Sequence, residues 1–83
     1  MILKLIIENK LYEFEVAKNY FEKGQTLQLT EVNNKMFAPL SNTFWFNSDL
    51  GFSNLSTITD ETDFFIPKTE FHFQLFELLS RLN

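Results

Sequence analysis

The sequence predicts a small α+β fold in which an N-terminal β-hairpin opens an antiparallel sheet and a C-terminal amphipathic helix packs on it. Apolar and alternating residues within 2–17 predict the hairpin, and apolar residues at helical spacing over 70–82 predict the helix. We expect residues 1–83 to form a single domain, because a chain of this length supports one hydrophobic core.

The hairpin is expected to turn at Asn9-Lys10, since Asn tolerates the positive φ that a two-residue turn needs. This register predicts three apolar cross-strand pairs on one face: Ile7 with Tyr12, Leu5 with Phe14 and Leu3 with Val16. On the other face it sets Lys4 against Glu15, so that opposite charges meet. A slip of one residue would move the apolar side chains to the polar face.

After the hairpin, residues 18–23 predict a connector that ends at Gly24, the residue type that most readily adopts a positive φ. One helical turn is an option for this connector. Residues 26–32 alternate again and predict a third strand, with Leu27 and Leu29 facing the core.

Residues 43–47 predict a further strand, in which Phe44 and Phe46 share one face and Trp45 points to the other. We expect Phe44 and Phe46 in the core, whereas Trp45 is either a core residue of the opposite face or an exposed anchor. Residues 48–63 show no clear period and predict either a long ordered loop, of the kind that often carries function, or irregular strands.

The C-terminal helix is expected over residues 70–82, with Thr69 as its N-cap. Its expected apolar face consists of Phe71, Leu75, Leu78, Leu79 and Leu82. Phe73 falls instead among the polar residues of the opposite face. Before the helix, residues 64–66 could form a short last strand that Pro67 ends.

The net charge of −4 comes from the middle of the chain, residues 36–67. This segment has no Lys or Arg, and its four carboxylates are Asp49, Asp60, Glu61 and Asp63. The flanks are balanced, with five Lys against five Glu in residues 1–35 and two cations against two Glu in residues 68–83. The same middle segment holds the single Trp and six of the eleven Phe.

Catalytic, metal-binding and cofactor-binding residues are not expected. The chain has no Cys, and its single His, His72, has no second His with which to bind a metal, so we assign it a structural or surface role. The carboxylate run at residues 60–63 lacks the ligand spacing and central Gly of a calcium loop. Glycine-rich phosphate loops and nucleophile motifs are also missing from the sequence, so an enzyme is not expected.

Direct nucleic-acid binding is not expected either, because the aromatic residues lie where cations are absent and the negative field repels phosphate. The N-terminal apolar run ends at Glu8, which is too short for a signal peptide or a membrane span. We therefore expect a cytoplasmic protein without a membrane partner.

These observations favour a non-enzymatic binding protein that docks on a larger basic protein, of the nucleic-acid-binding class, and inhibits it. Negative potential steers a basic partner, and large aromatic residues often carry the binding energy at interfaces. The expected contact residues are Trp45, Asp49, Phe52, Asp60, Glu61, Asp63 and Phe73. Phage anti-defence inhibitors and toxin-immunity proteins act in this manner, and the analogy is one of size and charge.

An alternative is a structural or assembly component that forms homo-oligomers, with a homodimer as the smallest form. Exposed aromatic side chains or an unpaired strand edge would then hold two copies of the chain together.

Overall fold

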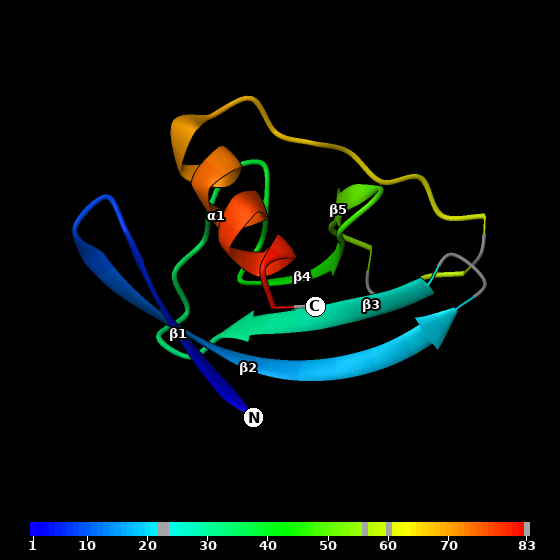
Figure 1. Ribbon diagram of the computed structural model, residues 1–83, viewed down its shortest axis with the longest axis horizontal. Helices are drawn as coiled ribbons and strands as arrows, with labels where there is room; N and C mark the ends of the chain where they lie inside the picture. Colours follow the sequence, from blue (N-terminus) through cyan, green and yellow to red (C-terminus); the bar gives the residue numbers. More distant parts are fainter. Residues whose placement is uncertain (22–23, 56, 60, 83) are drawn as a thin grey trace.

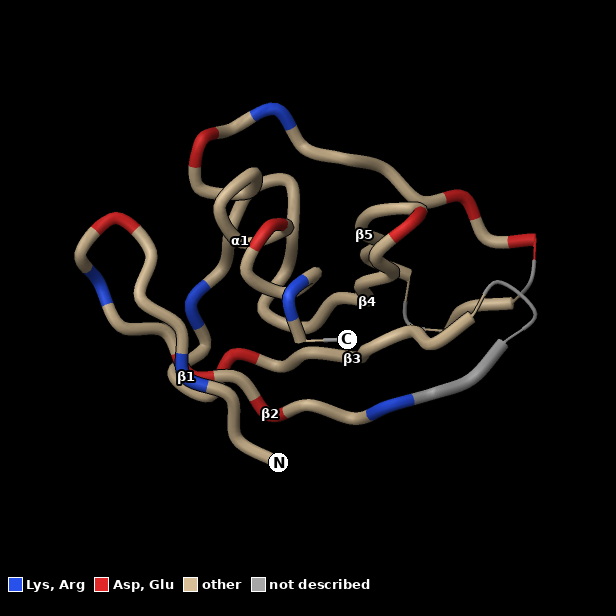
Figure 2. Tube along the Cα trace, viewed as in Figure 1, with Lys and Arg blue, Asp and Glu red and all other residues tan. Residues whose placement is uncertain are grey.

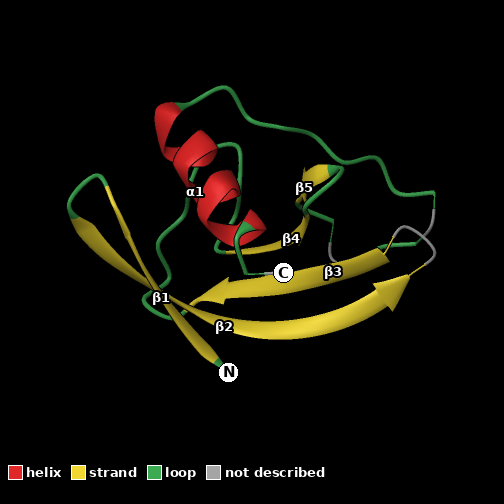
Figure 3. Ribbon diagram, viewed as in Figure 1, coloured by secondary structure: helices red, strands yellow, loops and turns green. Residues whose placement is uncertain are grey.

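In the computed structural model, which describes residues 1–21, 24–55, 57–59 and 61–82, the chain forms a five-stranded antiparallel sheet and one C-terminal helix (Figures 1 and 3). The strands are β1 (Ile2–Ile7), β2 (Lys10–Phe21), β3 (Gly24–Glu31), β4 (Thr43–Asn47) and β5 (Gly51–Ser53), and the helix is α1 (Glu70–Ser80). The strands lie in the sheet in chain order, so each pairs with its neighbour in sequence. This arrangement confirms the predicted α+β class.

Helix α1 covers one face of the sheet, here called the inner face (Figure 1). Alternate residues of each strand point to this face, as the period of two in a strand requires, and most of the buried apolar side chains lie on it. The fully buried members of the core are Ile7, Phe14, Leu29, Leu40, Phe44, Phe46, Phe52, Leu75 and Leu79. Burial of so many rings compensates for the small size of the chain, since each aromatic side chain removes a large apolar area from water.

The β1–β2 hairpin turns one residue earlier than predicted. Glu8 and Asn9 occupy the turn with φ of 52° and 66°, and Ile7 pairs with Lys10. Positive φ at both central residues is the geometry of the type I′ turn, whose twist matches that of the strands. A turn at Asn9-Lys10 would have required the positive φ at Lys10 instead.

The predicted pairing register of this hairpin is therefore wrong by two residues, whereas the predicted faces are right. Leu3 lies opposite Phe14 and Leu5 opposite Tyr12, and Lys4 lies opposite Glu13 instead of Glu15. A shift of two residues leaves every side chain on its original face, so the apolar pattern alone could not distinguish the two registers.

Strand β2 is longer than expected, and the connector predicted over residues 18–23 is wrong. The β2–β3 ladder continues through Lys18, opposite Leu27, and reaches the pair Phe21 and Gly24. Pairing with β3 thus extends the strand beyond the point where the alternation of polarity ends. Gly24 has a positive φ, as expected, but it begins β3 and does not end a helical turn. Residues 22 and 23 lie outside the described residues.

Strand β4 has the predicted bounds, and the segment after it, predicted as an ordered loop or irregular strands, contains one short strand, β5. Phe65 then pairs with Phe52 of β5 through two backbone hydrogen bonds of 2.7 and 2.8 Å. Residues 64–66 therefore contribute one β-bridge to the edge of β5 that faces away from β4. They do not form the short last strand that the sequence suggested.

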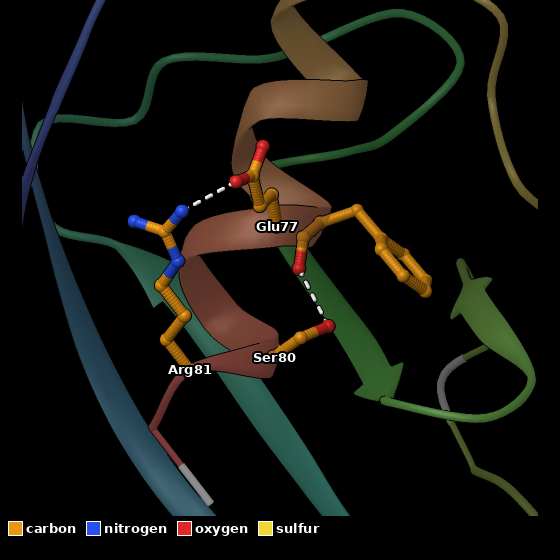
Figure 4. Close-up of polar contacts among 4 residues, drawn as sticks. Glu77, Ser80 and Arg81 are labelled. Atoms are coloured by element: carbon orange, nitrogen blue, oxygen red, sulfur yellow. Dashed lines mark hydrogen bonds and ion pairs between the residues drawn. The ribbon is translucent and has the colours of Figure 1, made fainter.

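Helix α1 begins at the predicted cap, since the Thr69 hydroxyl accepts a hydrogen bond of 3.2 Å from the backbone N–H of His72. Its buried residues are His72, Leu75 and Leu79, whereas Leu82 lies beyond the helix end and is exposed, contrary to prediction. At its C-terminal end the Arg81 guanidinium pairs with Glu77, and the Ser80 hydroxyl donates to the Phe76 carbonyl at 2.8 Å (Figure 4).

None of the described helices has both the length and the apolar character needed to cross a lipid bilayer.

Close contact between Gly51 and Phe65 predicts a specific stability effect. Gly51 has φ of 106°, and a Cβ at this position would clash with the Phe65 carbonyl oxygen. Gly24 has a similar φ of 100°, but nothing lies within 4 Å of a Cβ placed there. Gly24→Ala should therefore cost about 1–3 kcal/mol of backbone strain, and Gly51→Ala should cost about 1–3 kcal/mol more through overpacking.

Urea unfolding of the two variants measures this difference. Equal losses of stability in Gly24→Ala and Gly51→Ala would show that Phe65 does not pack against β5 as described.

Candidate protein-interaction surface

Trp45 belongs to a small cluster on the outer face of the sheet, the face opposite α1. Its side chain is 7% exposed, and its indole N–H donates a hydrogen bond of 2.9 Å to the Leu55 carbonyl. Ile58 and Thr62, from the segment that follows β5, are also buried. Of the two alternatives for Trp45, the structure thus supports the core residue of the opposite face, and the exposed anchor is wrong.

Phe52 is fully buried and cannot present its ring at the surface, contrary to expectation. Its register opposite Phe46 places the ring on the inner face. There the ring centroid lies 5.6, 5.4 and 5.9 Å from those of Phe44, Phe46 and Phe76. Pairing of β5 with β4 determines this position, and the sequence shows no periodicity from which that pairing could be predicted.

The acidic residues of the middle segment divide between two places. Glu61 and Asp63 are exposed side chains that line the same open groove, whose volume is about 540 Å³. Its lining residues are Ser53, Asn54, Leu55, Thr59, Glu61, Thr62, Asp63 and Phe65, and we call this feature the acidic groove. Asp49 is exposed on the β4–β5 turn and does not line the groove, and Asp60 lies outside the described residues.

Phe73 is 49% exposed on α1, in agreement with its position among polar residues, and it does not line the groove. The apolar residues of the groove are instead Leu55 and Phe65, which are both exposed. Sequence analysis missed these two residues, because residues 48–63 lack a period that would separate exposed from buried positions.

Local hydrogen bonds shape the floor of the groove. The backbone N–H of Thr59 donates to the Thr62 hydroxyl at 2.8 Å, and that of Thr62 donates to the Thr59 carbonyl at 3.1 Å. The Glu61 N–H donates to the Thr59 hydroxyl at 3.2 Å. These contacts fold the segment locally, and the bond from Trp45 to Leu55 connects the chain to the outer face of the sheet. Trp45 is thus a positioning residue for the groove.

The groove lining carries negative charge, since it includes the carboxylates of Glu61 and Asp63 and no Lys or Arg. Between Lys35 and Lys68 the chain itself carries no cation. Figure 2 shows the segment of residues 61–63 at the end of the molecule opposite the β1–β2 turn. The nearest cation before it, Lys35, lies with its ammonium 4.9 Å from the Tyr12 ring centroid and does not line the groove.

Two buried ionisable groups lie outside the groove. The Glu31 carboxylate accepts hydrogen bonds from the backbone N–H groups of Asn33 (2.9 Å) and Lys35 (2.7 Å), and so orders the connection that follows β3. His72 hydrogen-bonds the Thr69 hydroxyl through Nδ1. Both contacts are structural, and within the described residues no three His, Asp or Glu side chains come together as a metal site.

Comparisons with known proteins found no match for this chain. No protein-family model matches it, and neither a curated protein nor a solved structure shows a significant match.

Fluorescence of the single tryptophan tests the structure of the outer face. Because Trp45 is buried and bonded to Leu55, acrylamide should quench its emission several-fold less in the folded protein than in urea-unfolded chain. Equal quenching of the folded and unfolded chains would show that Trp45 is exposed in the folded protein.

Titration of His72 should also differ between the folded and unfolded chains. Burial lowers the pKa of His72 from its ordinary value of 6.5, and the backbone carbonyl of Phe37, which accepts from the charged ring, opposes this effect in part. The unfolded chain therefore takes up a proton at higher pH than the folded chain. Stability should be full above pH 6.5 and should fall as the pH drops from 6.5 to the lowered pKa.

Proton NMR of the single imidazole measures the pKa directly, and urea unfolding at several pH values measures the stability. His72→Gln lacks this titration, so its stability should change less over the same interval. A pKa of 6.5 or higher for His72 in the folded protein would contradict the prediction.

Proposed function

We propose that the protein binds a basic surface of a larger protein through the acidic groove and inhibits that protein by occupying the surface. One observation carries the proposal: Glu61 and Asp63 share an open groove with the exposed apolar side chains of Leu55 and Phe65. Carboxylates provide attraction and orientation, and apolar side chains beside them provide an area that a partner can bury.

A surface rich in Lys or Arg fits this combination. Both cations have long apolar stems that can pack on Leu55 and Phe65 while their charged ends reach Glu61 and Asp63. An Arg guanidinium can also stack on the Phe65 ring. Basic surfaces of this kind are typical of nucleic-acid-binding proteins, which are therefore the partner class that we propose.

Neutralisation of the groove tests the proposal. A short synthetic peptide of alternating Arg and Leu serves as the probe, and NMR follows the backbone amides of residues 53–55 and 61–65. Glu61→Gln with Asp63→Asn should weaken binding by about 2- to 30-fold, because each exposed ion pair contributes about 0.2–1 kcal/mol. The loss should shrink at high salt.

A double variant with the same change in net charge serves as the control. Glu8→Gln with Glu70→Gln alters two exposed carboxylates that do not line the groove, and it should leave binding almost unchanged. If both double variants weaken peptide binding equally, the affinity depends on the net charge of the protein and not on the groove. That result would contradict the proposal.

The native partner can then be sought with the same pair of variants. Immobilised wild-type protein and the control variant should retain a basic protein from a lysate of the native host, and the groove variant should not. Addition of the wild-type protein should inhibit the activity of the retained protein, and an unchanged activity would refute the inhibitory role.

A further inference from the structure

Strand β1 has a free edge, whereas the other edge of the sheet is covered. At β5, Phe65 exchanges two backbone hydrogen bonds with Phe52 and so covers that edge. At β1, the order of the strands leaves the side away from β2 without a partner strand in the described part of the chain. A free edge presents backbone donors and acceptors to any extended strand.

The backbone groups on this edge belong to Ile2, Lys4 and Ile6. Ile7 and Lys10 flank a two-residue turn and so exchange hydrogen bonds, and in an antiparallel ladder such pairs alternate with pairs that do not. The bond of 2.9 Å from the Val16 N–H to the Met1 carbonyl agrees with this alternation. Odd-numbered residues of β1 thus bond to β2, and even-numbered residues direct their N–H and C=O groups outward.

Side chains along this edge are unusually apolar for an unpaired strand. Ile2 and Ile6 are 48% and 69% exposed on the outer face, and the strand contains no Pro. Among the usual devices that protect a sheet edge, β1 has one charged side chain, Lys4. An isoleucine on each side of a single lysine favours an apolar partner strand.

We propose that β1 pairs with β1 of a second copy of this chain, antiparallel and around a two-fold axis at Lys4. In this register Ile2 lies opposite Ile6 of the second copy on the outer face, and Leu3 lies opposite Leu5 on the inner face. The two-fold registers shifted by two residues place Lys4 opposite Ile2 or Ile6, and those shifted by four residues pair only one end of β1. The proposed register is therefore the one that pairs residues 2–6 along their whole length and matches apolar residues on both faces.

Charges across the axis are also accommodated. Lys4 of each copy meets Lys4 of the other, and each lies opposite Glu13 of its own β2. The row across the joined sheet is thus Glu13, Lys4, Lys4 and Glu13, so that a carboxylate adjoins each cation. Because β1 and β5 are opposite edges of the sheet, the pairing does not involve the β5 edge, and this inference is independent of the proposed function.

Sedimentation equilibrium over a range of concentrations tests the dimer. The wild-type chain should form dimers and no larger species, because the two-fold pairing uses the free edge of both copies. Ile6→Lys removes two apolar pairs per dimer and should raise the dissociation constant by about 2- to 30-fold. Leu11→Lys serves as the control, since Leu11 lies directly opposite Ile6 on β2 but does not lie on the edge.

A cysteine at the axis provides a second, independent measurement. The chain has no Cys, so Lys4→Cys would create a single thiol, whose Cα should lie about 5.5 Å from its counterpart, within the range of a disulfide. Mild oxidation should link Lys4→Cys into dimers faster than Glu15→Cys, which is exposed on β2 away from the edge. A monomer at about 1 mM, larger assemblies, or equal cross-linking of both variants would overturn the proposal.

Discussion

The structure depends on the aromatic strand β4, which must be covered on both faces. Alternation along β4 directs Phe44 and Phe46 to one face and Trp45 to the other, so neither face of this strand can remain exposed without loss of apolar burial. Helix α1 covers the inner face, and the segment after β5 covers the outer face at Trp45. The long irregular middle of the chain is thus a structural layer as well as a surface.

This requirement explains why the aromatic residues of the middle segment serve the fold. Phe52 joins the rings of the inner face, and Trp45 bonds to Leu55 on the outer face. The surface that remains consists of the polar and acidic residues between these contacts, with Leu55 and Phe65 exposed beside them. Acidic and aromatic residues, which coincide in the sequence, are therefore largely separated in space, and Phe65 is the aromatic residue that lines the acidic groove.

The fold could be predicted where a local pattern determines the structure. Strand β4, the Thr69 cap and the faces of the hairpin follow from periodicity and from the side chains themselves. Three features depend on contacts with partner strands and cannot be predicted from a local pattern. They are the turn at Glu8-Asn9, the full length of β2 and the pairing of β5. A register shift of two residues in particular preserves both faces and is invisible to an argument from polarity.

The candidate site was predictable only in its charge. Exposure of Asp49, Glu61, Asp63 and Phe73 agrees with expectation, since these side chains cost too much to bury or fall on a polar helix face. The grouping of Glu61 and Asp63 with Leu55 and Phe65 depends on how residues 53–65 cross the sheet. Hydrogen bonds between Thr59 and Thr62 and from Trp45 to Leu55 contribute to this path. The first are local but follow no repeating pattern, and the second joins residues ten apart in the sequence.

The placement of the single tryptophan and the single histidine on opposite sides of the sheet has an experimental consequence. Trp45 lies beneath the segment after β5, and His72 lies in the helix that covers the other side. Each residue is thus a natural spectroscopic reporter for one layer, without any label. Optical and magnetic signals recorded in parallel can reveal whether the two layers detach together or in sequence, and in which order.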